Sequence, residues 1–145
     1  LNEVYREGCA LSGDKHHISL EINVQKSLVG NYDEVRSAFS NLLSNAIRYT
    51  PAGGTISVRW SERGEQLIYA VQDSGIGIAA QHIPRLTERF YRVDRSRSRE
   101  TGGTGLGLAI VKHIAMRHQA KLEISSIENQ GSTFAMVLPP RRAKA

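Results

Sequence analysis

The stretch of sequence that decides the fold is residues 31–50, NYDEVRSAFSNLLSNAIRYT. Its apolar residues recur every three or four positions, which is the spacing of an amphipathic helix with one face in a core. They are Val35, Ala38, Phe39, Leu42, Leu43, Ala46 and Ile47. Asn31 can cap this helix, and Glu34 three residues later completes a pattern like a capping box. Residues 51–54, PAGG, end it.

On both sides of this helix the pattern changes to the period of two that indicates a half-buried strand. Residues 17–24, HISLEINV, form one such segment before the helix. After it, residues 55–60 and 66–72 form two more, joined by a turn at 62–65, so a hairpin is expected. Residues 121–126 and 132–138, with a turn at 129–131, close the chain as a further strand pair.

A second amphipathic helix is predicted over residues 106–118, with Leu106, Ala109, Ile110 and Ile114 along one side. Residues 79–86 suggest a short helix, and residues 1–12 can also be helical. Residues 91–104 are polar, charged and glycine-containing without periodicity, which indicates a mobile loop.

Several strand pairs with few strand–helix–strand crossovers predict an α+β fold, a two-layer α/β sandwich whose mixed sheet is covered on one face by helices. A length of 145 residues fits one domain. Residue 1 is not Met, so we expect part of a longer protein. Residues 1–14 would then be the remnant of a linker or helix from another domain, 15–140 the domain itself, and 141–145 a solvated basic tail.

The composition is that of a globular domain with a net charge of +5. No apolar run approaches the roughly 20 residues that span a bilayer. The single cysteine, Cys9, excludes an internal disulfide and fits a reducing, cytoplasmic setting. Much of the positive charge lies in residues 85–99, beside glycine-rich sequence, so a phosphate ligand is as good an explanation as a nucleic-acid backbone.

Polar residues that can carry chemistry lie on one flank of the first helix: Asn41, Asn45, Arg48 and Tyr49. Offsets of three and four make them neighbours on the helix surface. Two amide oxygens suit Mg²⁺, which keeps several waters and bridges to phosphates. Arg48 can meet a phosphate and Tyr49 can stack on a base. The alternative is a polar flank that faces solvent, although Asn is a poor helix former.

The second constellation, residues 73–78 (DSGIGI), follows directly after a predicted strand. Asp73 can accept a hydrogen bond from an exocyclic amine such as that of adenine, and Gly75 and Gly77 let the backbone approach a flat ligand. A plain turn is the alternative. Gly75, Gly77 and Ala80 also match the outline of a dinucleotide fingerprint with Asp94 further on, but the short helix that follows and the preceding hairpin do not fit that context.

The third constellation is residues 102–108, GGTGLGL, which run straight into the second long helix. Glycines before a helix N-terminus expose backbone N–H groups to an anion. The P-loop spacing is absent, and a flexible hinge is the alternative. Among the neighbouring arginines, Arg92 is the candidate to neutralise charge on a transferring phosphoryl group.

Taken in order, these segments resemble the catalytic domain of sensor histidine kinases, within the wider GHKL group of ATPases with the Bergerat fold. Residues 41–50 resemble the family's N box, 73–77 its G1 box, 89–92 (RFYR) its F box and 103–107 its G2 box. The resemblance covers about residues 15–140. Residues 82–94, HIPRLTERFYRVD, resemble the phosphate-regulon branch of these kinases. Leu86 departs from the pattern, because the F box commonly opens with Phe.

The resemblance implies ATP as substrate and Mg²⁺ as cofactor, with a role for each matching residue. Asn45 would bind Mg²⁺ with support from Asn41, Arg48 would lie near the phosphates, and Tyr49 near the adenine. Asp73 would bind the adenine amine, and Gly75 and Gly77 would admit the base. The phosphates would meet the backbone of the G2 box, which consists of Gly103, Thr104, Gly105, Leu106 and Gly107. Residues 91–104 would form a lid.

Position 41 separates two branches of the group. ATP-hydrolysing members usually have Glu there as a general base, whereas Asn41 cannot take a proton at neutral pH. This favours phosphoryl transfer to a protein side chain, with Asn41 and Arg92 as the catalytic candidates. An ATPase or a serine/threonine kinase of the same fold is the alternative, and a basic nucleic-acid-binding module is a further one.

The phosphoacceptor motif of the family is missing, since none of the five histidines is followed by the acidic residue and Arg-Thr-Pro run. The resemblance therefore implies a histidine on a separate dimerisation domain and a response regulator as partners. It also implies a cytoplasmic domain of a parent anchored in the bacterial inner membrane, with no nucleic acid and no direct membrane contact.

Overall fold

The computed structural model describes residues 1–13, 15–88 and 107–144. Within these ranges the order of elements is α1 (Asn2–Ser12), β1 (His17–Ile22), β2 (Ser27–Leu28), α2 (Tyr32–Arg48), β3 (Thr55–Arg63), β4 (Gln66–Asp73), the 3₁₀ helix η1 (Ala80–Arg85), α4 (Gly107–Arg117), β5 (Lys121–Ile127), β6 (Gly131–Leu138), the 3₁₀ helix η2 (Pro140–Arg142) and β7 (Ala143–Lys144).

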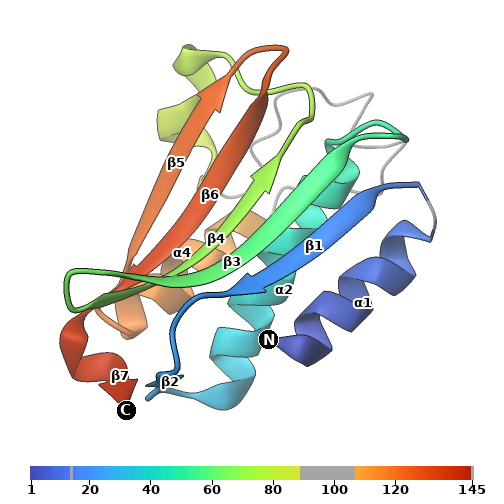
Figure 1. Cartoon of the computed structure of the whole chain (residues 1–145). Coiled ribbons are helices and arrows are strands. Elements are labelled where there is room, and N and C mark those ends of the chain that lie inside the picture. The colour runs from blue at the N-terminus through green and yellow to red at the C-terminus, as the bar shows by residue number, and fades with distance from the viewer. Residues whose placement is uncertain (14, 89–106, 145) are drawn as a thin grey trace.

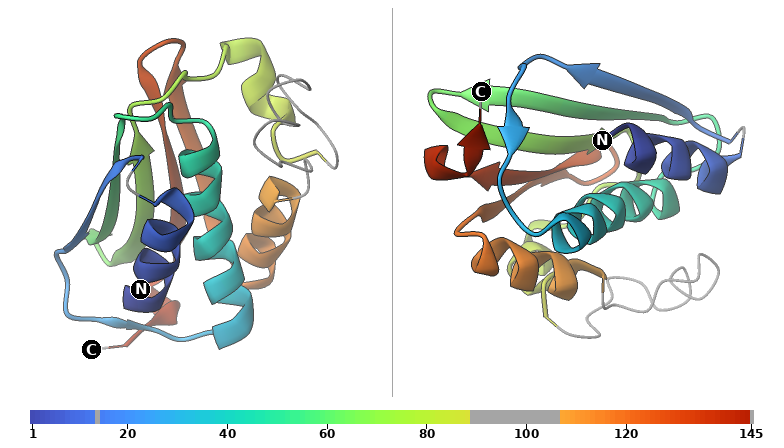
Figure 2. Two further views of the ribbon diagram at one scale, coloured as in Figure 1. Left: turned by 90° about the vertical axis from the view of Figure 1, so that its right-hand side faces the viewer. Right: turned by 90° about the horizontal axis from the view of Figure 1, so that it is seen from below.

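Five strands form one mixed sheet in the order β1-β3-β4-β6-β5. β1 runs parallel to β3, with α2 crossing between them, and every other pair is antiparallel. Helices α1, α2 and α4 lie side by side on one face of this sheet (Figures 1 and 2). The predicted two-layer α/β sandwich with helices on one face is confirmed.

The helix α2 holds the two layers together through the predicted apolar stripe, all seven of whose residues are buried. The ring of Phe39 stacks on that of Tyr69 in β4, with centroids 3.9 Å apart and planes 7° from parallel. The ring of Trp60 in β3 also lies against the ring of Phe39, with centroids 6.2 Å apart. The hydroxyl of fully buried Tyr69 donates to the carbonyl of Phe39 over 3.1 Å. Burial raises the pKa of Tyr69 above its ordinary value.

The helix α4 buries a face that includes the predicted Ile114 but is rotated away from Ile110. Val111, Ile114 and Ala115 are buried, whereas Ile110, assigned to the core from the sequence, is 42% exposed. This segment carries apolar residues along two neighbouring lines, so periodicity alone cannot choose between them. The choice is made by packing on α2 and β5, which are distant in sequence.

The start of α2 is capped differently from a capping box. Asn31 is the N-cap, and its side chain accepts from the backbone N–H of Glu34 over 3.0 Å, as predicted. The reciprocal bond is replaced, because the backbone N–H of Asn31 donates to Nε2 of His118 over 3.1 Å. The carboxylate of Glu34 instead pairs with Arg117 over 2.9 Å. Two residues at the end of α4 thus complete the cap.

Both ends of the chain are packed against the domain. Val4 of α1 is buried in the core, and α1 lies along α2. At the other end β7 pairs with β2, and Arg142 donates to the carbonyl of Val29 and to Oε1 of Gln119. These contacts tie residues 142–144 of the predicted tail to the domain, and the expectation of a basic tail at residues 141–145 stays a prediction. No helix in the described ranges is both long and apolar enough to cross a membrane.

Strand boundaries follow the prediction closely. β3 and β4 extend the predicted hairpin and meet at a turn in which Gly64 has a φ of +63°. The short helix expected at residues 79–86 is the 3₁₀ helix η1. The loop predicted at residues 91–104 lies outside the described residues.

Candidate functional site

The end of α2, the end of β4 and the start of α4 lie at the same end of the molecule (Figures 1 and 2). There the N box meets the G1 box, because the backbone N–H of Ile76 donates to the carbonyl of Tyr49 over 3.3 Å. A Cβ on Gly75 would lie 2.3 Å from that carbonyl oxygen and 3.0 Å from Oγ1 of Thr50. Only glycine allows the two segments to approach this closely.

Asp73 is the last residue of β4 and only 7% exposed. Its Oδ1 accepts from the backbone N–H of Gly75 over 2.9 Å, and the backbone N–H of Ser132 also donates to the carboxylate. Burial raises the pKa of Asp73 above its ordinary value, and these two N–H groups partly oppose that rise. A carboxylate held in this way is suited to accept a further hydrogen bond from a ligand amine.

Gly77 is required by the fold itself. Its φ is +69°, and a Cβ there would lie 2.1 Å from the carbonyl oxygen of Ile127. Two bonds from the β5–β6 hairpin hold its neighbours: Asn129 N–H donates to the carbonyl of Ile76 over 2.6 Å, and Ile78 N–H donates to Oγ of Ser126 over 2.7 Å. The G1 loop therefore has a fixed backbone, and the admission of a base by Gly77 stays a prediction.

The N box also meets the end of the G2 box. A Cβ on Gly107, the first residue of α4, would lie 3.1 Å from Oδ1 of Asn41. The amide nitrogen of Asn41 donates to the carbonyl of Ser37 over 2.8 Å. The oxygen of this side chain therefore points toward the start of α4, where backbone N–H groups of a helix N-terminus can attract an anion.

The donor set fits a magnesium ion that is shared with a phosphate ligand. In the part of the chain that the structure describes, no three His, Cys, Asp or Glu side chains gather in a way that could hold a metal. Asn41 and Asn45 are half-buried and one turn apart on α2. Two amide oxygens suit Mg²⁺ that takes its remaining ligands from phosphate and water, not a closed protein cage.

The structure places the other predicted residues only in part. Arg48 ends α2 and Tyr49 is its C-cap; both are half-buried, and the carbonyl of Tyr49 contacts the G1 loop. Arg92, the F box at 89–92, and the G2 residues Gly103, Thr104, Gly105 and Leu106 lie outside the described residues. Their roles stay predictions.

Two hydroxyl residues support the site without having been assigned a role from the sequence. Thr50 is buried, and its Oγ1 donates to the carbonyl of Ala46 over 2.7 Å. Oγ of Ser74 accepts from the backbone N–H of Thr55 over 2.8 Å, and Ser74 N–H donates to the carbonyl of Thr55. The Thr50 bond closes the last turn of α2, and the Ser74 bonds join the two ends of the β3–β4 hairpin.

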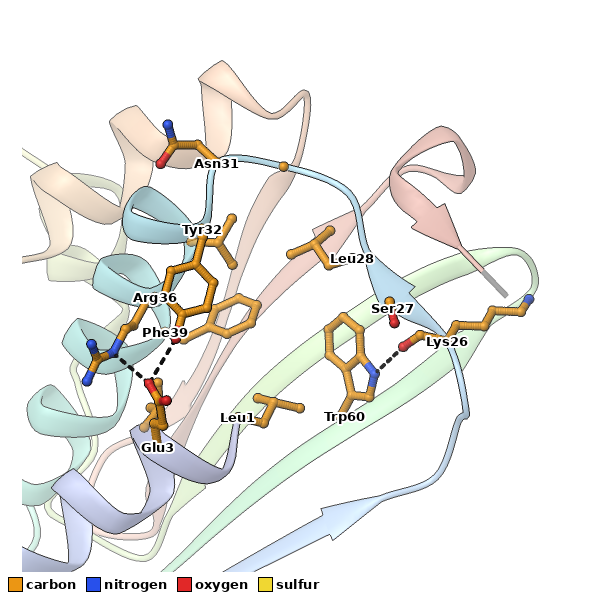
Figure 3. Close-up of a pocket in the computed structure, with 13 residues that line it drawn as sticks. Leu1, Glu3, Lys26, Ser27, Leu28, Asn31, Tyr32, Arg36, Phe39 and Trp60 are labelled. Atoms are coloured by element: carbon orange, nitrogen blue, oxygen red, sulfur yellow. Dashed lines mark hydrogen bonds and ion pairs between the residues drawn. The ribbon is translucent and has the colours of Figure 1, made fainter.

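A cavity of about 710 Å³ lies at the other end of α2. Trp60, Phe39, Leu28 and Leu1 surround it, and Tyr32 at its mouth donates to Glu3 over 2.8 Å (Figure 3). The indole N–H of Trp60 donates to a backbone carbonyl at its rim over 3.2 Å. Of the predicted site residues that the structure describes, none lines this cavity, which lies apart from them.

Comparison with known proteins identifies the family. Residues 30–142 match the family described as histidine kinase-, DNA gyrase B-, and HSP90-like ATPase. The chain is 54% identical over 143 residues to the phosphate regulon sensor protein PhoR of Pseudomonas aeruginosa, covering 97% of this chain and 32% of that protein. The PhoR of Haemophilus influenzae is 43% identical, with 97% and 33% covered. The chain thus spans about a third of the length of these relatives.

Solved structures agree with this relationship. The mycobacterial sensor histidine kinase MprB superposes with a TM-score of 0.80 at 26% identity, covering 95% of this chain and 93% of that one. The catalytic domain of the histidine kinase ThkA superposes with a TM-score of 0.77 at 25% identity, covering 98% and 95%. This chain therefore belongs to the family of histidine kinase-, DNA gyrase B- and HSP90-like ATPases, and it is homologous to the catalytic domains of sensor histidine kinases.

Proposed function

We propose that this chain binds ATP with Mg²⁺ and transfers the γ-phosphoryl group to a histidine on a separate dimerisation domain. The phosphoryl group then passes to an aspartate of a response regulator, in phosphate-regulon signalling as the names of the PhoR relatives suggest. The observation that carries the proposal is the contact of Tyr49 with Ile76 beside buried Asp73, which joins the N box and the G1 box into one site.

The described residues divide the work of holding ATP. Asp73 accepts a hydrogen bond from the adenine amine, and Tyr49 lies against the base. Asn41 and Asn45 hold the metal, and the start of α4 at Gly107 faces the phosphates. Mg²⁺, when bound, neutralises charge on the phosphates. The crystal structure of full-length ShkA in complex with AMPPNP, with a TM-score of 0.84 at 23% identity, shares this fold.

In the transfer, the bond between the γ-phosphorus and the β–γ bridging oxygen breaks, and a bond forms between that phosphorus and an imidazole nitrogen. ADP leaves with the bridging oxygen, and the imidazole loses its proton to solvent. The protein contributes position and charge neutralisation more than covalent chemistry. Asn41 offers no base for an attacking water, which favours this transfer over hydrolysis.

The partners follow from the same proposal. The phosphoryl acceptor lies on a dimerisation domain of the same kinase, and the response regulator receives the group afterwards. The domain works in the cytoplasm, and its parent is anchored in the inner membrane.

The deciding experiment is calorimetric titration of AMPPNP into the chain, with and without Mg²⁺, followed by addition of the dimerisation domain with radiolabelled ATP. We expect magnesium-dependent 1:1 binding, no labelling of the chain alone and labelling of the added domain. A folded chain that binds no nucleotide contradicts the proposal.

A GHKL-type ATPase or a serine/threonine kinase is the second candidate, because it would use the same pocket. Steady phosphate release by the isolated chain, or label stable to acid on the acceptor, would favour it. Salt-sensitive binding of DNA or RNA without nucleotide binding would instead favour the basic binding module.

A further inference from the structure

One side chain joins the N-terminal helix to the candidate nucleotide site. Nε2 of His16 lies 2.5 Å from the carbonyl oxygen of Thr50, and its Nδ1 lies 2.8 Å from Oγ of Ser12, the last residue of α1. A carbonyl only accepts, so Nε2 carries the proton and donates to Thr50. The hydroxyl of Ser12 then donates to Nδ1 while it accepts from the backbone N–H of His16 over 3.2 Å. Every polar atom of this bridge has a partner.

The carbonyl of Thr50 lies next to the backbone contacts that hold the G1 loop. The carbonyl of the preceding residue, Tyr49, accepts from Ile76, and Oγ1 of Thr50 lies next to Gly75. The residue after it is Pro51, which has no N–H. A shift of the Thr50 backbone would therefore move the contacts at Gly75 and Ile76 and, with them, the G1 loop that contains Asp73.

Backbone contacts beside His16 make the junction close. Gly53 N–H donates to the carbonyl of Lys15 over 2.6 Å, and His17 N–H donates to the carbonyl of Gly54 over 3.0 Å. The segment after α1 thus lies along the loop that connects α2 to β3. Among the described residues of this junction, His16 contributes the side chain that reaches Thr50.

The helix α1 is itself fixed to the body of the domain. A Cβ on Gly8 would lie 2.3 Å from the side chain of Leu43 in α2, and the hydroxyl of Tyr5 donates to the carbonyl of Ile18 in β1 over 3.1 Å. Arg36 of α2 pairs with Glu7. Because α1 is packed on α2 and β1, and His16 is bonded to Thr50, the His16 bridge can transmit a displacement of α1 to the nucleotide site.

We infer that His16 is a positioning residue that couples α1 to the adenine side of the nucleotide site through the carbonyl of Thr50. The inference rests on the proposed function, because it concerns affinity for the nucleotide. Thermodynamic reciprocity requires the coupling to act in both directions, so bound nucleotide must also hold α1 more firmly.

A pair of amide variants tests which nitrogen matters. Glutamine places its side-chain N–H where Nε2 lies and can donate to Thr50, whereas asparagine reaches only the position of Nδ1 beside Ser12. We expect His16→Asn and His16→Ala to weaken ATP and ADP binding by roughly five- to tenfold, the effect of one hydrogen bond. His16→Gln should retain the wild-type Kd within about threefold. His17→Ala, which changes an exposed neighbour, is the control and should match the wild type.

The only cysteine, Cys9, reports on α1, since it is half-buried on that helix. Saturating Mg·ATP should slow the reaction of Cys9 with a thiol reagent in the wild type and in His16→Gln. In His16→Asn, Mg·ATP should no longer slow this reaction. A merely structural role would change the rate without changing its dependence on nucleotide. Wild type that binds no ATP contradicts the proposed function. If the wild type and His16→Asn bind ATP with the same affinity, the inferred coupling is wrong but the proposed function still stands.

Discussion

The backbone N–H of Gly75 donates to Oδ1 of Asp73 over 2.9 Å, which closes an Asx-type turn at the end of β4. It fixes one oxygen of a carboxylate that is almost fully buried. The fold thus keeps at this point a group whose burial is unfavourable for its charged form. Such an arrangement is typical of a residue kept for binding, which leads to the first prediction.

Asp73→Asn should leave the free energy of unfolding at neutral pH equal to or above that of the wild type. The pKa of Asp73 is raised in the folded chain, so as pH rises above the ordinary value of 3.8 the unfolded chain loses the proton first. Wild-type stability therefore falls over that range, and the variant lacks this fall. ATP affinity should drop about 10- to 100-fold, as for a charged hydrogen bond. Urea unfolding across pH and calorimetry measure the two effects; a variant that is less stable but binds normally would contradict the assignment.

Asn45→Ala should weaken Mg·ATP binding by about tenfold, ~1.4 kcal/mol, because it removes a metal ligand. The unfolding midpoint should be retained, since Ala is a better helix former and Asn45 is only half-buried. Calorimetry with and without Mg²⁺ provides the measurement. Ser40→Ala, five residues earlier on α2, is the matched control, and an equal loss for both variants would remove Asn45 from the metal site.

Gly77→Ala should destabilise the chain far more than Gly64→Ala. Both residues have positive φ, +69° and +63°, so both variants carry backbone strain of about 1–2 kcal/mol. A Cβ on Gly77 would also collide with the carbonyl oxygen of Ile127, whereas nothing lies within 4 Å of one on Gly64. We expect at least about 2 kcal/mol more loss at Gly77, together with weaker ATP binding as the G1 loop leaves the β5–β6 hairpin. Urea unfolding of both variants decides this, and equal losses would argue that strain alone acts.

Tyr69→Phe should lower the free energy of unfolding by about 1 kcal/mol, because it removes the bond to the carbonyl of Phe39 and retains the ring stack. Tyr32→Phe, whose hydroxyl bonds to Glu3 at the surface, should change it by less than about 0.5 kcal/mol. The difference in the free energy of unfolding between the wild type and Tyr69→Phe should depend on pH. Burial raises the pKa of Tyr69, so above its ordinary value of 10.0 only the unfolded wild type releases the proton and its stability falls.

The difference in the free energy of unfolding between the wild type and Tyr69→Phe should be smaller at pH 11 than at pH 8, as measured by unfolding curves. A gap of constant size would mean that the hydroxyl ionises freely in the folded chain.

The elements that the sequence predicted well are those whose signal lies in consecutive residues. The stripe of α2, the hairpin of β3 and β4 and the N-cap at Asn31 depend on periodicity and turn chemistry within a short window. The prediction failed where a distant partner made the choice. Glu34 pairs with Arg117 instead of completing a capping box, and Ile110 is exposed because α4 packs through Val111, Ile114 and Ala115.

The candidate site shows the same division. The sequence by itself determined the class of fold, the order of the motifs and the residue types, including an amide in place of a carboxylate at Asn41. Only the tertiary structure decided that Tyr49 meets Ile76, that Asn41 meets Gly107 and that His16 reaches Thr50. Helix and turn propensities act between near neighbours in the chain, whereas these contacts join residues 27 to 66 positions apart. Their geometry exists only once the helices pack on the sheet, because that packing alone brings the segments together.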